Sequence, residues 1–206
     1  MYQLFESIRV ENGIAQSIYF HQLRVNKSLQ CGAENVNLES YINSISFPKK
    51  GIFKLKIIYS KEGINNHYIS VYTNKNIESL MIVNGDNLTY NNKYLDRSQI
   101  DKALELKGEC DDILIIKNGL VSDTSYSNIV LYDKFNSIWV TPDSPLLEGT
   151  CRASLLQSGK LTPIRVELDD LFKGRYIKLV MINAMIGFDP ESSGLELKTC
   201  LRRTLV

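Results

Sequence analysis

Four separated features of the sequence could take part in chemistry. Lys93, in "NNKYLDRSQ", offers an amine that can attack a carbonyl carbon. Arg24, in "HQLRVNKS", carries a planar guanidinium group that can hold a phosphate through two parallel hydrogen bonds. Asp123, in "GLVSDTSYSN", offers a carboxylate. Thr150 and Cys151, in "LLEGTCR", begin an expected helix, whose unpaired backbone N–H groups and dipole favour an anion.

Each feature also has an ordinary structural interpretation, which the local pattern alone favours. Lys93 could be a solvated residue of a polar turn, and Arg24 could belong to a surface ion pair. Asp123 could accept a hydrogen bond within its own turn, and the residues at 149–150 could simply begin a capped helix. The hypothesis of a shared site rests on their order: a basic clamp, a lysine, a carboxylate and an anion-binding helix end.

The N-terminal part of the chain is predicted to contain both strands and helices. "LFESIRV" alternates apolar and polar residues, which indicates a strand at 4–10 followed by a turn at 11–13. Apolar residues at helical spacing predict a helix at 17–31, and Asn37 is a candidate N-cap for a short helix at 38–45. Short alternating or β-branched segments then indicate an antiparallel meander at 52–60, 67–73 and 79–85.

The pattern changes after Lys93. A helix is predicted at 96–108, followed by a buried type of strand at 111–117 that ends in an Asn-Gly turn. A hairpin at 127–142 and a helix at 148–159 follow, and the chain continues with a strand, a short helix and another strand.

These elements predict an α+β fold of two lobes. The first is a small α+β lobe at 1–88, and the second is a larger, strand-rich lobe with helices at 89–206. The chain of 206 residues, 44% of them hydrophobic, is long enough to bury a substantial core.

Composition and charge exclude several classes of protein. The formal net charge is +1, so no overall field attracts nucleic acid or an anionic membrane. No apolar run approaches the roughly 20 residues of a membrane-spanning helix, and "MYQLFESIRV" does not have the pattern of a signal peptide. Four cysteines without a CxxC pair, and only two histidines, argue against a disulfide framework and against a metal site. We therefore expect a cytoplasmic protein that acts on a small molecule and binds no metal.

The order of the four features matches the needs of a pyridoxal phosphate enzyme. In such an enzyme a lysine forms a Schiff base with the cofactor, a carboxylate keeps the pyridine nitrogen protonated, and an anion site binds the phosphate. Over nearly its whole length the chain resembles the fold-type IV family of these enzymes. That family includes branched-chain and D-amino acid aminotransferases and 4-amino-4-deoxychorismate lyases.

Six ordered segments carry the resemblance. "LFESIRVENG" is similar to the family's early "FET-R-DG" strand, and "HQLRVNKS" is similar to its "H-x-x-R-L" helix. "NKYLDR" resembles the lysine segment in its lyase-type spelling, and "DDILIIKNGLVSDTSYSNIVLYD" resembles the central strand, turn and carboxylate. "WVTPDSPLLEGTCRASLL" is similar to "TP…LL-G-T-R…LL", and "VMINAMIGF" is similar to the late "NA" strand of the lyase type.

The resemblance implies roles for the matched residues. Lys93 would carry pyridoxal 5'-phosphate and later act as the general base and acid. Asp123 would stabilise the protonated ring nitrogen. Arg24 would hold the phosphate together with the backbone N–H groups of Thr150 and Cys151.

The resemblance also implies further contacts and a homodimer. Ser127 would lie under the ring of the cofactor, and Arg9 and Asn183 are candidates for binding the amino substrate. Core polar satisfaction or a surface strand position would explain these last two residues equally well. His21 lies one helical turn before Arg24 and is interpreted as a packing or capping residue, because this chemistry needs no histidine.

Two features depart from the family pattern. The family usually has Glu where this chain has Asp123, so the cofactor ring must sit closer to this shorter side chain or the loop must shift. Members also commonly carry further residues before the first strand. We therefore expect one or two edge strands of the first lobe, which usually support dimer contacts, to be missing.

Three functions are compatible with this pattern. The leading hypothesis is a 4-amino-4-deoxychorismate lyase, which eliminates pyruvate to give 4-aminobenzoate for folate biosynthesis. The spellings "KYLDR" and "INAM" and the compact length support it. The second is a class IV aminotransferase acting on branched-chain or D-amino acids, which would use the same residues and return the amino group to a keto acid. The third is a relative that binds pyridoxal phosphate without catalysis.

Overall fold

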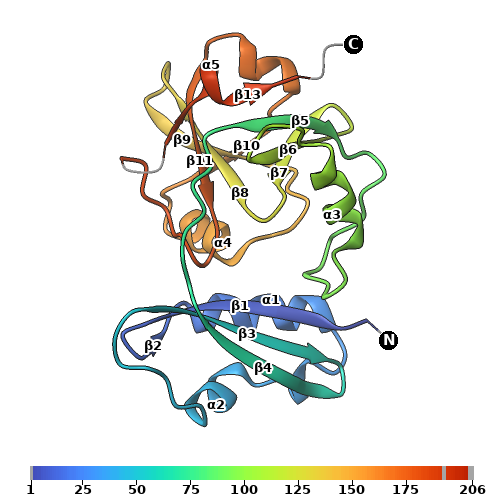
Figure 1. Cartoon of the computed structure of the whole chain (residues 1–206), viewed down its shortest axis with the longest axis vertical. Coiled ribbons are helices and arrows are strands. Elements are labelled where there is room, and N and C mark those ends of the chain that lie inside the picture. Colours follow the sequence, from blue (N-terminus) through green and yellow to red (C-terminus); the bar gives the residue numbers. More distant parts are fainter. Residues whose placement is uncertain (1, 192–193, 204–206) are drawn as a thin grey trace. The chain divides into compact units, whose positions relative to one another are not determined.

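The computed structural model describes residues 2–191 and 194–203 (Figure 1). These residues form two compact units. Unit 1 contains the chain up to Asn74, together with Asn92–Asp96 and Ala184–Ile186, and unit 2 contains the remaining described residues. The combination of helices and strands confirms the predicted α+β class.

Unit 1 is built on an antiparallel sheet with the strand order β2-β1-β3-β4. β1 pairs with β3 along its whole length, from Leu4 opposite Tyr59 to Glu11 opposite Ile52. This confirms the first predicted strand and the first two strands of the predicted meander. The strands are β1 (Leu4–Glu11), β2 (Ile14–Ala15), β3 (Ile52–Ser60) and β4 (Gly63–Val71).

Two helices of unit 1 pack on one face of this sheet. They are α1 (Ile18–Leu29) and α2 (Leu38–Asn43), joined through the 3-10 turn η1 (Ala33–Asn35). Asn37 caps α2 as predicted, since its side-chain oxygen accepts a hydrogen bond from the Ser40 N–H at 2.9 Å.

The alternation of β1 decides which residues face these helices. Leu4, Glu6, Ile8 and Val10 share one face, because side chains two residues apart point the same way. The three apolar members of this set belong to a buried core with residues of α1, α2 and β3. Each fully buried Ile or Leu stabilises the fold by about 1.5–3 kcal/mol, so this core fixes the register of β1 and places Glu6 on the inner face.

Unit 2 contains a sheet with the strand order β13-β5-β6-β7. β5 pairs in parallel with β6, and α3 (Ser98–Glu105) lies in the connection between them. The prediction that this strand completes a meander with β3 and β4 is therefore wrong, and residues 75–88 lie in unit 2 instead of the first lobe. The unbroken apolar run at 80–83 is typical of a parallel strand. The strands are β5 (Leu80–Asn84), β6 (Asp112–Lys117), β7 (Leu120–Thr124) and β13 (Leu201–Arg202).

The second sheet of unit 2 has the order β10-β9-β8-β11-β12, with β8 at its centre. β8 and β9 form the predicted hairpin, and β8 also pairs with β11. Because β7 belongs to the other sheet, the turn at 125–127 carries the chain from one sheet to the next. The strands are β8 (Asn128–Asp133), β9 (Ile138–Pro142), β10 (Thr162–Ile164), β11 (Tyr176–Ile182) and β12 (Leu195–Glu196).

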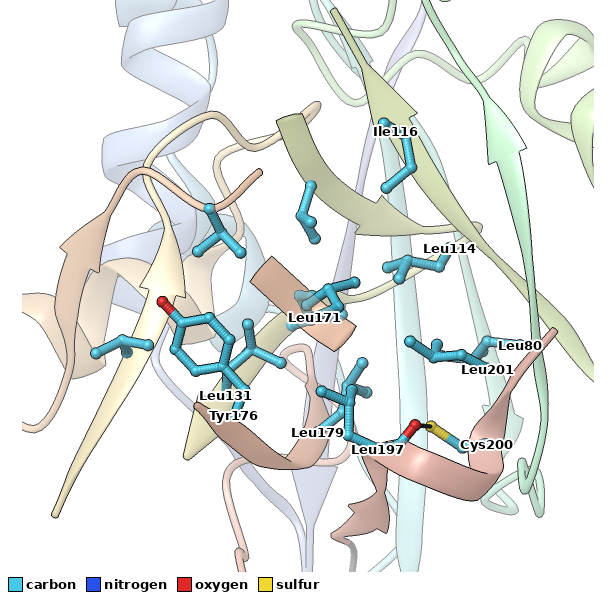
Figure 2. Close-up of a cluster of buried hydrophobic side chains, with 14 of the residues drawn as sticks. Leu80, Leu114, Ile116, Leu131, Leu171, Tyr176, Leu179, Leu197, Cys200 and Leu201 are labelled. Atoms are coloured by element: carbon cyan, nitrogen blue, oxygen red, sulfur yellow. Dashed lines mark hydrogen bonds between the residues drawn. The ribbon is translucent and has the colours of Figure 1, made fainter. Parts of the chain in front are cut away.

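The two sheets of unit 2 share one apolar core, shown in Figure 2. Leu80 and Leu114 enter it from one sheet, and Leu131 and Leu179 enter it from the other. The short elements η2 (Leu168–Phe172) and α5 (Leu197–Cys200) also contribute to it. On its other face the sheet of β8 packs against α4 (Thr150–Gln157).

Within the described part of the chain, no helix combines the length and the apolar character needed to cross a bilayer.

Candidate active site

Lys93 is held by a short extension of the unit 1 sheet. Tyr94 forms an antiparallel bridge with Leu4, and the Phe5 N–H donates a hydrogen bond to the Lys93 carbonyl oxygen at 3.0 Å. The side chain of Lys93 is half-buried, with Nζ 4.8 Å from the centre of the Phe5 ring. Lys93 is therefore an ordered residue at the edge of a sheet, and not a loosely solvated turn residue.

The face of β1 that carries Phe5 also carries several cations. Arg9 lies directly opposite Lys54 of β3, and Lys56 lies two residues further along the same face. The Nζ of Lys56 is 4.8 Å from the ring of Phe5, the same ring that Lys93 approaches. Like charges directly opposite each other on neighbouring strands destabilise a sheet. This cationic face, defined by Arg9, Lys54, Lys56 and Lys93, is thus suited to an anionic ligand.

Arg9, a predicted substrate residue, also has partners within the protein. Its Nε donates to Glu11 at 3.2 Å, and its Nη1 donates to the carbonyl oxygen of Met185. These contacts fix the guanidinium group at the end of β1, and its substrate role stays a prediction.

Arg24 projects from α1 and binds Glu6 of β1. Its Nε donates to Oε1 of Glu6 at 2.9 Å, and its Nη2 donates to Oε2. Burial of Glu6 acts to raise its pKa, but the charge of Arg24 and the hydrogen bond from His21 outweigh it and lower the pKa to about 2. The alternative interpretation of Arg24 as an ion-pair residue is thus correct, although the pair is buried and not on the surface. The phosphate-binding role of Arg24 remains a prediction.

His21 completes this arrangement, which we name the Glu6 cluster (Glu6, His21 and Arg24). Nδ1 of His21 lies 2.6 Å from Oε2 of Glu6. Burial lowers the pKa of His21, even though the bond to Glu6 raises it, so the ring is neutral and Nδ1 carries the hydrogen. Nε2 is then an acceptor, and among the described residues no donor reaches it.

Our interpretation of the sequence missed Glu6, although a signal was present. Glu6 stands between Leu4 and Ile8 on the inner side of an alternating strand, where a carboxylate must be paired. His21 and Arg24 are three residues apart and therefore share a face of α1. An acid on the inner face of a strand and two basic residues on one face of the next helix predict a buried pair.

In unit 2, Asp123 is buried at the end of β7. Its Oδ1 accepts a hydrogen bond from Nδ2 of Asn128 at 2.8 Å, and its Oδ2 accepts one from the Leu147 N–H at 2.9 Å. Burial raises the pKa of Asp123 to about 6, although these bonds and the charge of Arg152 act to lower it. The donors that contact this carboxylate are neutral amides, so its charge is only partly compensated.

Arg152 supports this region from α4. Its Nη2 donates to the carbonyl oxygen of Pro142 at 2.9 Å, and its Nε donates to the hydroxyl of Thr141 at 3.3 Å. These bonds tie α4 to the end of β9, and they hold a buried positive charge near Asp123.

The N-terminus of α4 lies next to Asn128. Gly149 is the N-cap residue and provides no side-chain cap. A Cβ atom on Gly149 would lie 2.1 Å from Oδ1 of Asn128, so glycine is required for this approach. The first N–H groups of α4, on Thr150 and Cys151, have no partner within the helix. Burial raises the pKa of the Cys151 thiol to about 11, which leaves the thiol protonated.

The structure also brings Ser127 and Asn183 together. Nδ2 of Asn183 donates to Oγ of Ser127 at 2.9 Å. The Thr124 N–H donates to the Ser127 carbonyl oxygen at 2.9 Å, which closes the turn between β7 and β8. Arg97 adds a hydrogen bond to the Ser125 carbonyl oxygen at 2.9 Å. The predicted contacts of Ser127 with a cofactor and of Asn183 with a substrate stay predictions.

Each unit contains residues whose chemistry suits a part of pyridoxal phosphate. Unit 1 holds the half-buried amine of Lys93, which suits a Schiff base with the aldehyde of the cofactor. Unit 2 holds an incompletely compensated carboxylate on Asp123, which suits a protonated ring nitrogen. It also holds a helix N-terminus that Gly149 leaves open, which suits a phosphate.

Comparisons with known proteins bear on the family to which the chain belongs. No protein-family model matches the chain. An uncharacterized protein from Haemophilus influenzae is 36% identical over 192 residues, which are 91% of this chain and 100% of that protein. The crystal structure of a candidate 4-amino-4-deoxychorismate lyase from Haemophilus somnus 129pt is 32% identical, with a TM-score of 0.79, covering 91% of this chain and 98% of that one.

A more distant structure shows the same fold with the cofactor present. It is the pyridoxal phosphate-bound form of a hypothetical aminotransferase from Mycobacterium tuberculosis, 16% identical with a TM-score of 0.71. The match covers 97% of this chain and 81% of that one. With the Haemophilus relatives aligned over almost their entire length, the chain belongs to the fold-type IV pyridoxal phosphate enzymes.

Proposed function

We propose that the protein is a 4-amino-4-deoxychorismate lyase, which splits its substrate into 4-aminobenzoate and pyruvate. The 32% identical relative from Haemophilus somnus is a candidate for the same activity. The observation that carries the proposal is the cationic face of β1 and β3.

The cationic face suits a substrate with two carboxylates, which 4-amino-4-deoxychorismate has. Arg9 and Lys54 lie opposite each other and Lys56 lies nearby, so the positive charges exceed the single negative charge that Glu11 supplies to Arg9. A ligand that brings two carboxylates would relieve this repulsion. Each charge-assisted hydrogen bond is worth about 1.5–3 kcal/mol, or about tenfold or more in affinity.

The cofactor, when bound, supplies an electron sink for the carbon that carries the substrate's amino group. The amine of Lys93 removes the proton from that carbon. The bond to the enolpyruvyl oxygen then breaks, the ring becomes aromatic, and the Lys93 ammonium returns the proton to the leaving group, which becomes pyruvate. Asp123, whose pKa burial raises to about 6, would be ionised at neutral pH and would stabilise the protonated ring nitrogen when the cofactor is bound.

Release of pyruvate in the absence of any keto acid tests the proposal. We expect the full-length protein, supplied with pyridoxal phosphate and 4-amino-4-deoxychorismate, to release pyruvate, which lactate dehydrogenase reports through NADH. Lys93→Ala removes this activity, and Lys102→Ala, an exposed lysine on α3, serves as the matched control with unchanged activity.

A second pair of variants tests the cationic face. Lys54→Gln and Lys56→Gln should each raise KM for the substrate by about tenfold, since each removes a charge-assisted hydrogen bond to a carboxylate. Turnover that depends strictly on 2-oxoglutarate, with amino transfer and no pyruvate release, would identify the protein as an aminotransferase instead.

We also propose a homodimer in the cytoplasm. The homodimer follows from the family, and light scattering should give twice the 23.5 kDa mass of one chain. The cytoplasmic location is supported by four cysteines that all carry free thiols in the structure. Fractionation of cells that express the tagged protein tests the location.

A further inference from the structure

We propose that Glu6, held by His21, is a positioning residue that fixes the guanidinium group of Arg24 for the phosphate of the cofactor. The inference rests on the proposed function, because it takes Arg24 as a ligand of that phosphate. Glu6 itself touches neither cofactor nor substrate in this proposal.

The geometry of the Glu6 cluster limits how Arg24 can point. Glu6 accepts from both Nε and Nη2 of Arg24, so one whole edge of the planar guanidinium group is bound to one carboxylate. A guanidinium held at two points cannot rotate about its long axis without breaking both bonds. The other edge, formed by Nη1 and Nη2, therefore keeps one direction, which a bidentate bond to a phosphate requires.

His21 fixes the carboxylate in turn. Its Nδ1–H donates to Oε2 of Glu6, so the side chain of Glu6 is held from α1 at two positions, His21 and Arg24. The hydroxyl of Tyr59 on β3 lies 3.5 Å from Oε1, at the limit of a hydrogen bond. The carboxylate thus has its strong partners on the helix, and it links the orientation of Arg24 to the sheet.

Stability does not account for this cluster. A buried ion pair often contributes no more to stability than apolar residues of the same volume, because both charges lose their hydration. The unpaired Nε2 of His21 adds a further cost, since a buried acceptor without a donor is unfavourable. Two costly features at one place favour a role in orientation, and Arg24 is the one member of the cluster that remains partly exposed, at 10% of its side chain.

Comparison of two ligands separates positioning of Arg24 from general stabilisation. Pyridoxal 5'-phosphate and pyridoxal share the aldehyde that reacts with Lys93, but pyridoxal lacks the phosphate. The free 5'-hydroxyl of pyridoxal also forms a hemiacetal in solution, which affects all variants equally. The change between variants in the ratio of the dissociation constant of pyridoxal to that of pyridoxal phosphate therefore isolates the phosphate contribution. It is measured on the full-length chain at pH 7.5 from the absorbance of the bound aldehyde.

Glu6→Gln should lower this ratio by about 10- to 100-fold, by analogy with the loss caused by removing an outer-shell residue that orients a metal ligand. The loss should come from weaker binding of pyridoxal phosphate, with pyridoxal unchanged. His21→Leu should lower the ratio by about tenfold, and His21→Asn should restore it, because the Asn amide can replace the Nδ1–H donor. If Glu6→Gln does not fold, the comparison of His21→Leu with His21→Asn tests whether the Glu6 cluster positions Arg24.

Asp133→Asn is the matched control, because Asp133 is also fully buried and accepts from Nε and Nη2 of one arginine, Arg175. It should leave the ratio unchanged. The inference is overturned if the wild type prefers pyridoxal phosphate but Glu6→Gln keeps the wild-type ratio, or if Asp133→Asn lowers the ratio equally. A wild type that binds pyridoxal phosphate no better than pyridoxal overturns both the inference and the proposed role of Arg24.

Discussion

Replacement of Asp123 by Asn should make the ligand-free protein more stable near neutral pH. Asp123 is 5% exposed, and burial raises its pKa from 3.8 to about 6. Because the folded state has the higher pKa, it holds the proton more tightly than the unfolded state. The resulting stabilisation is complete below pH 3.8 and is lost as the pH rises through about 6.

The size of this effect follows from the two pKa values. The difference between 3.8 and about 6 corresponds to about 3 kcal/mol at 1.36 kcal/mol per pKa unit. Asn cannot ionise, and it resembles the protonated carboxyl in its hydrogen bonding: one oxygen accepts from Asn128, and the other position no longer accepts from the Leu147 N–H. The variant should therefore match the wild type to within about 1 kcal/mol near pH 4, and exceed it by about 3 kcal/mol at pH 7.5.

Denaturant unfolding followed by tryptophan fluorescence measures the free energy of unfolding of unit 2, which contains Asp123. Trp139 is the single tryptophan of the chain, and it lies in β9 of unit 2 in contact with Tyr132 and Phe188. Other titrating groups, such as Glu6, are common to both proteins and cancel in the comparison. A difference that does not change between pH 4 and pH 7.5, or a variant that is less stable at pH 7.5, would refute the reasoning.

With pyridoxal phosphate at 100 times its dissociation constant, the wild type should gain about 2.7 kcal/mol in its free energy of unfolding. The variant should gain less, because it cannot pair with the ring nitrogen.

Three further variants probe the surroundings of this carboxylate. Gly149→Ala should destabilise unit 2 by about 1–3 kcal/mol in the same unfolding assay, because the new Cβ atom would clash with Asn128. A variant as stable as the wild type would show that α4 can move away from Asn128. Cys151→Ser should keep pyruvate release within about twofold, since the raised pKa leaves the thiol unreactive; a loss of 100-fold would assign the sulfur a direct role. Arg97→Gln should lower kcat by about tenfold through the lost bond to the Ser125 carbonyl oxygen, and an unchanged kcat would show that the turn holds its shape without it.

Local signals in the sequence predicted most elements correctly. Alternation identified β1, helical spacing identified α1, and Asn37 caps α2 as expected. The pairing of β5 could not be obtained in the same way, because alternation and turn residues describe a strand and not its neighbour. Its parallel partner β6 is reached only through α3, and that non-local connection is decided by packing of the whole unit.

The same holds for the candidate site: the sequence indicated the residue types, but not the partners of each residue. The sequence indicated Lys93, Arg24 and Asp123 by their chemistry and order. The inward place of Glu6 in β1 indicated a buried pair that our interpretation missed, and the packing of β1 against α1 makes Arg24 its partner. The sequence did not show that Asp123 has only neutral donors in contact, which depends on the approach of Asn128 and Leu147.

The two buried carboxylates suit different roles because their hydrogen-bond partners differ in charge. Glu6 and Asp123 are both removed from water, yet the pKa of Glu6 falls to about 2 and that of Asp123 rises to about 6. The cause is that Glu6 contacts the cation of Arg24, while the donors in contact with Asp123 are uncharged. A carboxylate that is already neutralised gains little from a second cation, so Glu6 suits a positioning role. A carboxylate whose charge is not yet compensated is stabilised most by a new cation, so Asp123 is the residue to which a protonated ring nitrogen would bind. The opposite pKa shifts, which follow from contacts within each unit, therefore support the assignment of Asp123, and not Glu6, as the partner of the cofactor ring.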